Sequence, residues 1–162
     1  MDHGRIGAGV RRALLAAVAS GALVAACGAA SSPSPAPATT VNVTLQEFAV
    51  LPDVASVPAG TVTFVATNTG PEDEHELVVI KTDLGPSDLP VDADKKVLED
   101  GAGIEFIGEI EGIAVDGTDQ ADFVLEPGKY VLICNILQTE PDGSLESHYA
   151  VGMRTPFEVT AP

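Results

Sequence analysis

The side chains with the most distinctive chemistry lie near the C-terminal end of the sequence. Cys134 follows an apolar run, and after a polar loop come His148 and Met153, five positions apart. A further histidine, His75, lies far upstream, two positions before the start of another apolar run. A thiolate, two imidazoles and a thioether together suit a soft metal ion, copper above all. These four residues are therefore predicted to form one copper site.

Residues 1–26 are predicted to be a cleaved leader. Three arginines precede an apolar stretch that ends at residue 26 and is too short to span a bilayer as a stable helix. The stretch ends in Leu-Val-Ala-Ala followed by Cys27, which resembles a bacterial lipobox. The resemblance implies a lipid on Cys27 and a position on the outer face of the bacterial cytoplasmic membrane. The alternative is a plain secretory signal with an incidental cysteine.

Removing the leader leaves a strongly acidic chain. Of the 8 basic and 24 acidic residues, five basic and 23 acidic ones lie after residue 26, which gives a formal charge of −18. Such a charge excludes direct nucleic-acid binding and repels anionic lipid. It would steer a cation or a basic protein partner toward the surface, although solubility alone also explains it.

Removing the leader also isolates the metal-binding residues. With Cys27 as the lipid anchor, the mature chain contains one free cysteine, Cys134, and one methionine, Met153, besides His75 and His148. A lone thiol outside the cell has no internal disulfide partner and needs another reason to persist. The remaining set of two imidazoles, one thiolate and one thioether is the set that copper electron-transfer sites use.

The rest of the chain shows the pattern of an all-β domain. Residues 27–40 are rich in Pro, Ser and Ala and are predicted to be a linker, and residues 41–162 to be the domain. Short apolar–polar alternations separated by Gly, Pro and Asp predict seven or eight strands, and no long segment has helical periodicity. This spacing predicts a β-sandwich. Its core is expected to contain four phenylalanines: Phe64, Phe106, Phe123 and Phe157.

Four segments together resemble the cupredoxins, the family of blue or type 1 copper proteins that includes plastocyanin and azurin. They are Pro58-Ala-Gly-Thr-Val-Thr-Phe-Val-Ala-Thr-Asn-Thr-Gly, His75-Glu-Leu, Pro127-Gly-Lys-Tyr-Val-Leu-Ile-Cys-Asn and His148-Tyr-Ala-Val-Gly-Met. The resemblance covers residues 41–159 and implies a Greek-key sandwich with one type 1 copper ion. It further implies that His75, Cys134 and His148 are the equatorial ligands and Met153 the weak axial ligand.

The chain departs from the family pattern at two places. Thirteen residues, Asn135 to Ser147, separate Cys134 from His148, where the family has a much shorter gap. The Pro-Asp-Gly within this segment predicts a small acidic hairpin whose ends still close. The second departure is Glu76, which follows the first histidine where plastocyanin and azurin have an asparagine that braces the site. Glu76 would favour Cu(II). Besides Glu76, Asn68 and Asn135 are predicted to support the ligands from outside.

The leading hypothesis is a membrane-anchored, extracytoplasmic one-electron carrier. Its partner would be a cytochrome or a membrane oxidase or reductase, and the protein is expected to be a monomer held at the membrane by its lipid alone. Two alternatives stay open: a copper-handling protein without an electron-transfer role, and a metal-free binding sandwich. An enzyme is not expected, because the mature chain has too few histidines for further copper centres and no nucleophile–base pair or phosphate loop.

Overall fold

A computed structural model describes residues 38–162, so the predicted leader, Cys27 and most of the predicted linker lie outside the described residues. The elements of the described part are β1 (Thr39–Gln46), β2 (Ala49–Pro52), β3 (Ser56–Pro58), β4 (Gly60–Asn68), β5 (His75–Lys81), β6 (Glu105–Ile113), β7 (Thr118–Leu125), β8 (Gly128–Ile133), β9 (Leu137–Thr139), β10 (Leu145–Ser147), α1 (His148–Val151) and β11 (Arg154–Thr160). Seven strands have six or more residues, and four short ones add to the predicted count. The first strand begins two residues before the predicted domain boundary.

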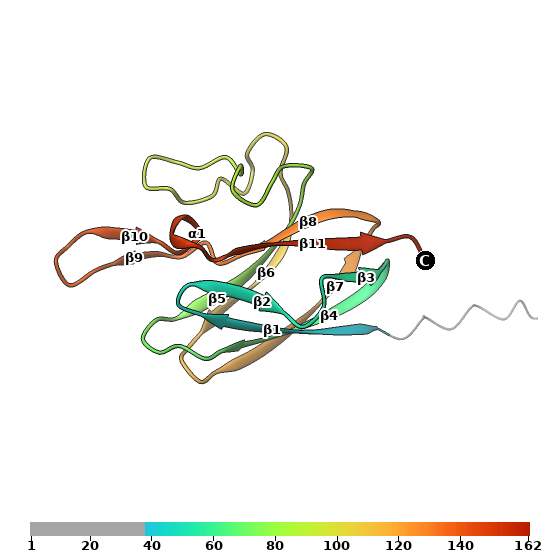
Figure 1. The fold of residues 1–162 in the computed structure, drawn as a ribbon, viewed down its shortest axis with the longest axis horizontal. Coiled ribbons are helices and arrows are strands. Elements are labelled where there is room, and N and C mark those ends of the chain that lie inside the picture. The colour runs from blue at the N-terminus through green and yellow to red at the C-terminus, as the bar shows by residue number, and fades with distance from the viewer. Residues whose placement is uncertain (1–37) are drawn as a thin grey trace, which may run out of the picture. The chain divides into compact units, whose positions relative to one another are not determined.

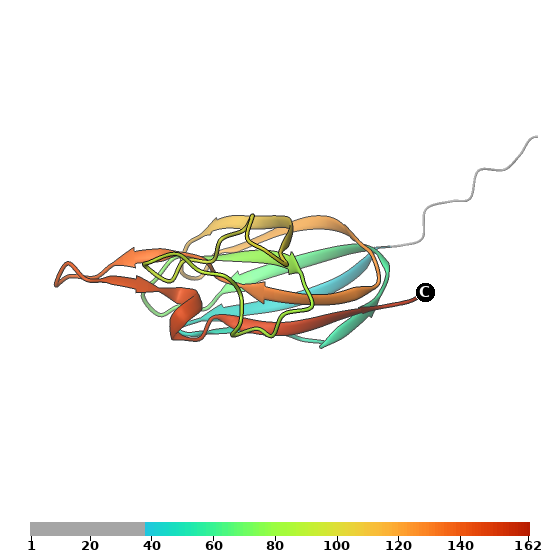
Figure 2. The same cartoon turned by 90° about the horizontal axis from the view of Figure 1, so that it is seen from above.

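Nine of the eleven strands form two mixed sheets that pack face to face, and β9 and β10 pair separately (Figures 1 and 2). One sheet has the order β2-β1-β4-β7 and the other the order β3-β11-β8-β5-β6. The chain passes from one sheet to the other at five places: on both sides of β3, between β4 and β5, and on both sides of β7. Connections of this kind are typical of Greek-key sandwiches. The β-sandwich prediction is confirmed.

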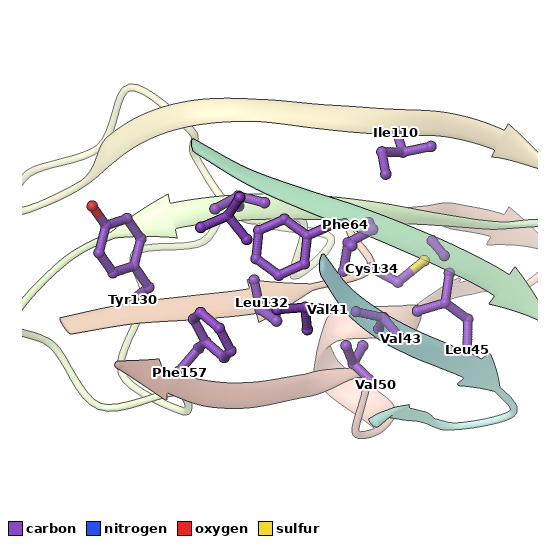
Figure 3. Packing of buried hydrophobic residues seen from close by; sticks show 14 of the residues in the cluster. Val41, Val43, Leu45, Val50, Phe64, Ile110, Tyr130, Leu132, Cys134 and Phe157 are labelled. Carbon is purple, nitrogen blue, oxygen red and sulfur yellow. The ribbon is translucent and has the colours of Figure 1, made fainter. Parts of the chain in front are cut away.

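Alternating apolar side chains of the two sheets meet in one core (Figure 3). Phe64 on β4 is fully buried, with its ring centroid 5.6 Å from that of Phe157 and 6.1 Å from that of Phe123. The prediction that Phe106 also belongs to the core is wrong, because its side chain is 41% exposed. Phe106 lies on the edge strand β6, directly opposite Ile80 of the neighbouring strand. Directly opposed residues share a face of the sheet, so Phe106 lies on the outer side of its sheet.

The loop between β5 and β6 covers this outer side over the two central strands, β5 and β8. A second cluster of buried side chains forms there from Val78, Ile80, Leu89, Val97, Val131, Ile133 and Tyr149. The hydroxyl of Tyr149 donates to the carbonyl of Pro86 at 2.8 Å and fastens the loop. Strands β5 and β8 are therefore buried on both faces, which explains their uninterrupted apolar sequences. No helix within residues 38–162 has the length and apolarity that a membrane crossing requires.

Replacing Phe64 by alanine should destabilise the protein by about 3–5 kcal/mol, because the change leaves a cavity between the two sheets. The measurement is urea-induced unfolding at constant pH. Val124→Ala is the matched control, since Val124 is 77% exposed on the same sheet and should change stability by about 0.5 kcal/mol or less. Equal losses in the two variants would contradict this description of the core.

Candidate metal centre

Two neighbouring strands bring His75 and Cys134 together. His75 is the first residue of β5, and Cys134 directly follows the last residue of β8. The strands are antiparallel, with Val78 opposite Ile133, so the start of β5 and the end of β8 lie at the same end of the sheet. The thiol sulfur of Cys134 lies 3.9 Å from Nδ1 of His75.

A four-residue helix positions the other two predicted ligands. Helix α1 begins at His148, and its N-cap, Ser147, accepts a hydrogen bond from the backbone N–H of Ala150 at 3.1 Å. Gly152 ends the helix at φ 141°, where a Cβ atom would lie 3.0 Å from the carbonyl oxygen of Phe48. The chain turns back at this glycine, and the N–H of Met153 donates to the carbonyl of His148 at 2.9 Å.

The long segment between Cys134 and His148 forms the predicted hairpin. Strands β9 and β10 pair antiparallel, with Leu137 opposite Ser147, and extend away from the sandwich (Figures 1 and 2). The N–H of His148 donates to the carbonyl of Ile136 at 3.0 Å, and the N–H of Cys134 donates to that of Met153 at 3.1 Å. The ends of the hairpin therefore close, and the insertion leaves the two ligands adjacent.

The donor atoms of three side chains converge. Nδ1 of His75 lies 3.2 Å from Nδ1 of His148, and the sulfur of Cys134 lies 3.4 Å from the latter. All three ligand atoms lie within 4.8 Å of one another, and the three residues are completely buried. Two such donors bound tetrahedrally to one ion with bonds of about 2.0–2.3 Å lie roughly 3.3–3.5 Å apart. The donor set and its spacing therefore fit a single transition-metal ion.

Met153 is completely buried in the same core cluster as Cys134. The structure thus places it beside the ligand-bearing loop, and its role as an axial ligand stays a prediction. Figure 3 shows Cys134 among the buried side chains of this core.

The site is uncharged before a metal binds. Burial lowers the pKa of His75 and of His148, although the carboxylates of Glu47 and Asp73 oppose this, so both imidazoles are neutral at pH 7. Burial raises the pKa of Cys134 to about 12, although its hydrogen bond from the N–H of Glu76 at 3.5 Å acts against the shift. The metal-free protein therefore holds a thiol that a metal ion must deprotonate.

Glu76 and Asn135 connect the two central strands beside the cysteine. The carboxylate of Glu76 accepts a hydrogen bond from the N–H of Asn135 at 3.0 Å. The side chain of Asn135 accepts from the N–H of Val97 at 2.7 Å and donates to the carboxylate of Glu99 at 2.8 Å. These contacts tie the residue after Cys134 to the covering loop. Burial, and next the charge of Glu109, raise the pKa of Glu76 to about 7, against the hydrogen bond from Asn135.

Asn68 fixes the loop that leads to His75. Its amide donates to the carbonyls of Asp73 and Ile113, both at 2.8 Å, and its oxygen accepts from the N–H of Gly70 at 2.8 Å. Asn68 is completely buried and satisfies both ends of its amide with backbone groups. It therefore acts on the site through the backbone rather than on a ligand directly.

Three residues that the sequence did not single out also face the ligands. Glu47 Oε1 lies 3.5 Å from Nε2 of His75, and Asp73 Oδ2 lies 4.0 Å from Nε2 of His148. The ring of Phe48 meets that of His148 edge-on, with centroids 5.6 Å apart. Asp73 lies two residues before His75, which is a weak signal in the sequence. Glu47 and Phe48 belong to the turn between β1 and β2, and nothing in their spacing marks them.

Binding of Cu(I) should release the proton of Cys134. Because the thiol pKa is about 12 and both imidazoles are neutral, the dissociation constant should fall about tenfold per pH unit between pH 7 and pH 9. Competition with a chromophoric chelator at several pH values measures it. Cys134→Ala, which has no thiol proton to lose, should bind weakly and without this slope. A pH-independent wild-type affinity would contradict the prediction.

Glu76 should make the metal-free protein less stable as the pH rises. Its pKa in the folded state lies above the ordinary value of 4.5, so the folded state binds more protons than the unfolded one between about pH 4.5 and pH 7. This contribution, on the order of 1–3 kcal/mol, is present below pH 4.5 and is lost as the pH rises through about 7.

Glu76→Gln keeps an acceptor for the N–H of Asn135 and removes the charge. The metal-free variant should therefore be more stable than the wild type at pH 8 and equally stable near pH 4, as measured by urea unfolding. Glu74→Gln, at an exposed neighbouring position, is the control. A constant stability difference across this range would refute the assignment.

Comparisons with known proteins agree on the fold. No family model and no curated protein matches this chain. Among solved structures it is similar to the dithionite-reduced auracyanin of Roseiflexus castenholzii, with 24% identity and a TM-score of 0.52 over 78% of this chain and 100% of that one. It is also similar to rusticyanin from Thiobacillus ferrooxidans, with 19% identity and a TM-score of 0.50 over 75% of this chain and 76% of that one.

These structural neighbours are blue copper cupredoxins. Rusticyanin is a copper protein. At these identities the likeness establishes the fold. The predicted cupredoxin resemblance is confirmed at that level.

Proposed function

We propose that this chain is an extracytoplasmic mononuclear copper protein that carries one electron at a time. The observation that carries the proposal is the convergence of two imidazole Nδ1 atoms and one thiol within 4.8 Å, completely buried at one end of a cupredoxin fold. The shared fold with rusticyanin, a copper protein, supports the same conclusion. A copper ion bound here would supply a one-electron couple.

The residues of the chain hold such an ion in a fixed frame. His75, Cys134 and His148 would hold it, with Met153 as a further, weaker ligand. The ligands come from two central strands and a helix that are linked by backbone hydrogen bonds. The N–H of Glu76 would donate to the thiolate, and burial keeps water away from the metal. Little needs to move when the oxidation state changes, which favours rapid electron transfer.

The location and the partner rest on the sequence. A lipid on Cys27 would attach the protein to the outer face of the cytoplasmic membrane, with residues 27–40 as a tether. The formal charge of −18 after residue 26 favours a partner with a basic surface, such as a cytochrome or a membrane oxidase or reductase. We infer no enzymatic reaction at the site.

One observation favours a second candidate, a copper-handling protein without an electron-transfer role. His148 is completely buried, and Phe48 and Asp73 lie against its ring. An electron entering through this ring would have to cross these side chains. The electron self-exchange rate of the copper protein separates the two functions. Rapid exchange supports an electron carrier, whereas immeasurably slow exchange supports copper handling.

Protein loaded with Cu(II) should show an intense visible thiolate-to-copper band at one copper per chain. Cys134→Ser should abolish the band, because a hydroxyl cannot replace the thiolate as a charge donor. Cys27→Ser is the matched control and should keep the band, since Cys27 is predicted to carry lipid rather than metal. A colourless wild type without stoichiometric copper would overturn the proposed function.

A further inference from the structure

The outer nitrogens of both histidine ligands are buried without a partner. Among residues 38–162, three buried side-chain polar atoms lack a hydrogen bond: Nε2 of His75, Nε2 of His148 and Oε2 of Glu47. All three belong to side chains at the predicted metal site. Unsatisfied buried polar atoms are rare and costly in folded proteins, so their coincidence at one place points to a function.

Two carboxylates face these nitrogens. Oε1 of Glu47 lies 3.5 Å from Nε2 of His75, and Oδ2 of Asp73 lies 4.0 Å from Nε2 of His148. The side chains of both acids are mostly buried, with 11% and 15% of their surfaces exposed. Each distance exceeds a normal hydrogen bond by less than about 1.3 Å, so a small rotation of either side chain closes it.

Both carboxylates are held by groups outside the ligands. Oε1 of Glu47 accepts hydrogen bonds from the backbone N–H groups of Glu72 at 3.1 Å and of Asp73 at 2.7 Å. Oδ1 of Asp73 accepts a hydrogen bond from the side chain of Gln138 on β9. The hairpin inserted between Cys134 and His148 therefore supplies the residue that holds Asp73 against His148.

We propose that Glu47 and Asp73 are positioning residues that accept the Nε2 protons of the two histidine ligands and favour Cu(II) over Cu(I). This inference rests on the proposed function. A proton fixed on Nε2 leaves the lone pair of Nδ1 free, and both Nδ1 atoms point toward the thiol of Cys134. Carboxylates in this position orient metal-bound histidines and raise their basicity. Their negative charge lies beyond the imidazoles and stabilises the more positive oxidation state.

The test uses the isosteric variants Glu47→Gln and Asp73→Asn. Each keeps an oxygen that can accept the existing hydrogen bonds while removing the charge. Glu74→Gln is the matched control, because this exposed carboxylate adjoins His75 in the chain and does not face a ligand nitrogen in the structure. The readouts are Cu(II) and Cu(I) affinity by chelator competition, the reduction potential and the unfolding free energy of the metal-free protein.

Each of the two variants should weaken Cu(II) binding roughly 10- to 100-fold and Cu(I) binding less, so the reduction potential should rise. Glu74→Gln should stay within about twofold of the wild type for both oxidation states. Loss of stability in the variants with unchanged affinity ratios and potential would overturn the inference, because the carboxylates would then only brace the loop.

A measurement on metal-free protein separates this inference from the proposed function. Nitrogen-15 NMR of the imidazoles should show both wild-type histidines protonated on Nε2, with Nδ1–H populations appearing in Glu47→Gln at His75 and in Asp73→Asn at His148. Wild-type histidines protonated on Nδ1 would overturn the inference. A wild type that binds no copper but shows the Nε2–H tautomers would overturn the proposed function and the effect on copper, while the positioning of the two imidazoles by Glu47 and Asp73 would stand.

Discussion

The structure depends on the complete burial of three polar, metal-binding side chains at one end of an apolar sandwich. Without water to solvate a charge, the imidazoles of His75 and His148 stay neutral and the thiol of Cys134 stays protonated. A metal cation reverses this situation, since it replaces the thiol proton and brings its own charge to the three donors. The buried site therefore keeps its ligands uncharged until a metal cation would replace the thiol proton.

The surrounding carboxylates combine support of the backbone with control of the charge. Glu47 holds the loop before β5 through two backbone N–H groups, and Glu76 holds the residue after Cys134 through one. Each carboxylate comes close to a ligand side chain or to the strand that carries one, so fixing the loop also fixes the position of a negative charge. The same contacts thus determine the ligand geometry and bias the oxidation state of a bound ion. The two effects can be distinguished only by substitutions that preserve the hydrogen bonds.

The sequence predicts which metal-binding residue types converge because these types are rare after residue 26. It predicts the long strands because alternation survives wherever one face of a strand is buried. His75, Cys134 and His148 converge as predicted. The prediction that Phe106 belongs to the core is wrong because residue type does not indicate which face of an edge strand is covered. Glu47 lies in a turn far from every ligand in the chain, and only the folded backbone brings it to His75. Contacts of this kind depend on loop conformation, which leaves no periodic signal.

The hairpin between Cys134 and His148 shows why a large departure from a family pattern need not disturb the site. The entropic cost of a longer loop grows only slowly with its length, provided that its ends are fixed. Here the ends are fixed by the hydrogen bond from His148 to Ile136 and by the bond from Cys134 to Met153. The insertion can then extend away from the sheets while Gln138, near its base, reaches Asp73. The inserted hairpin thus leaves the spacing of the ligands intact, and its residue Gln138 contacts Asp73, which faces His148.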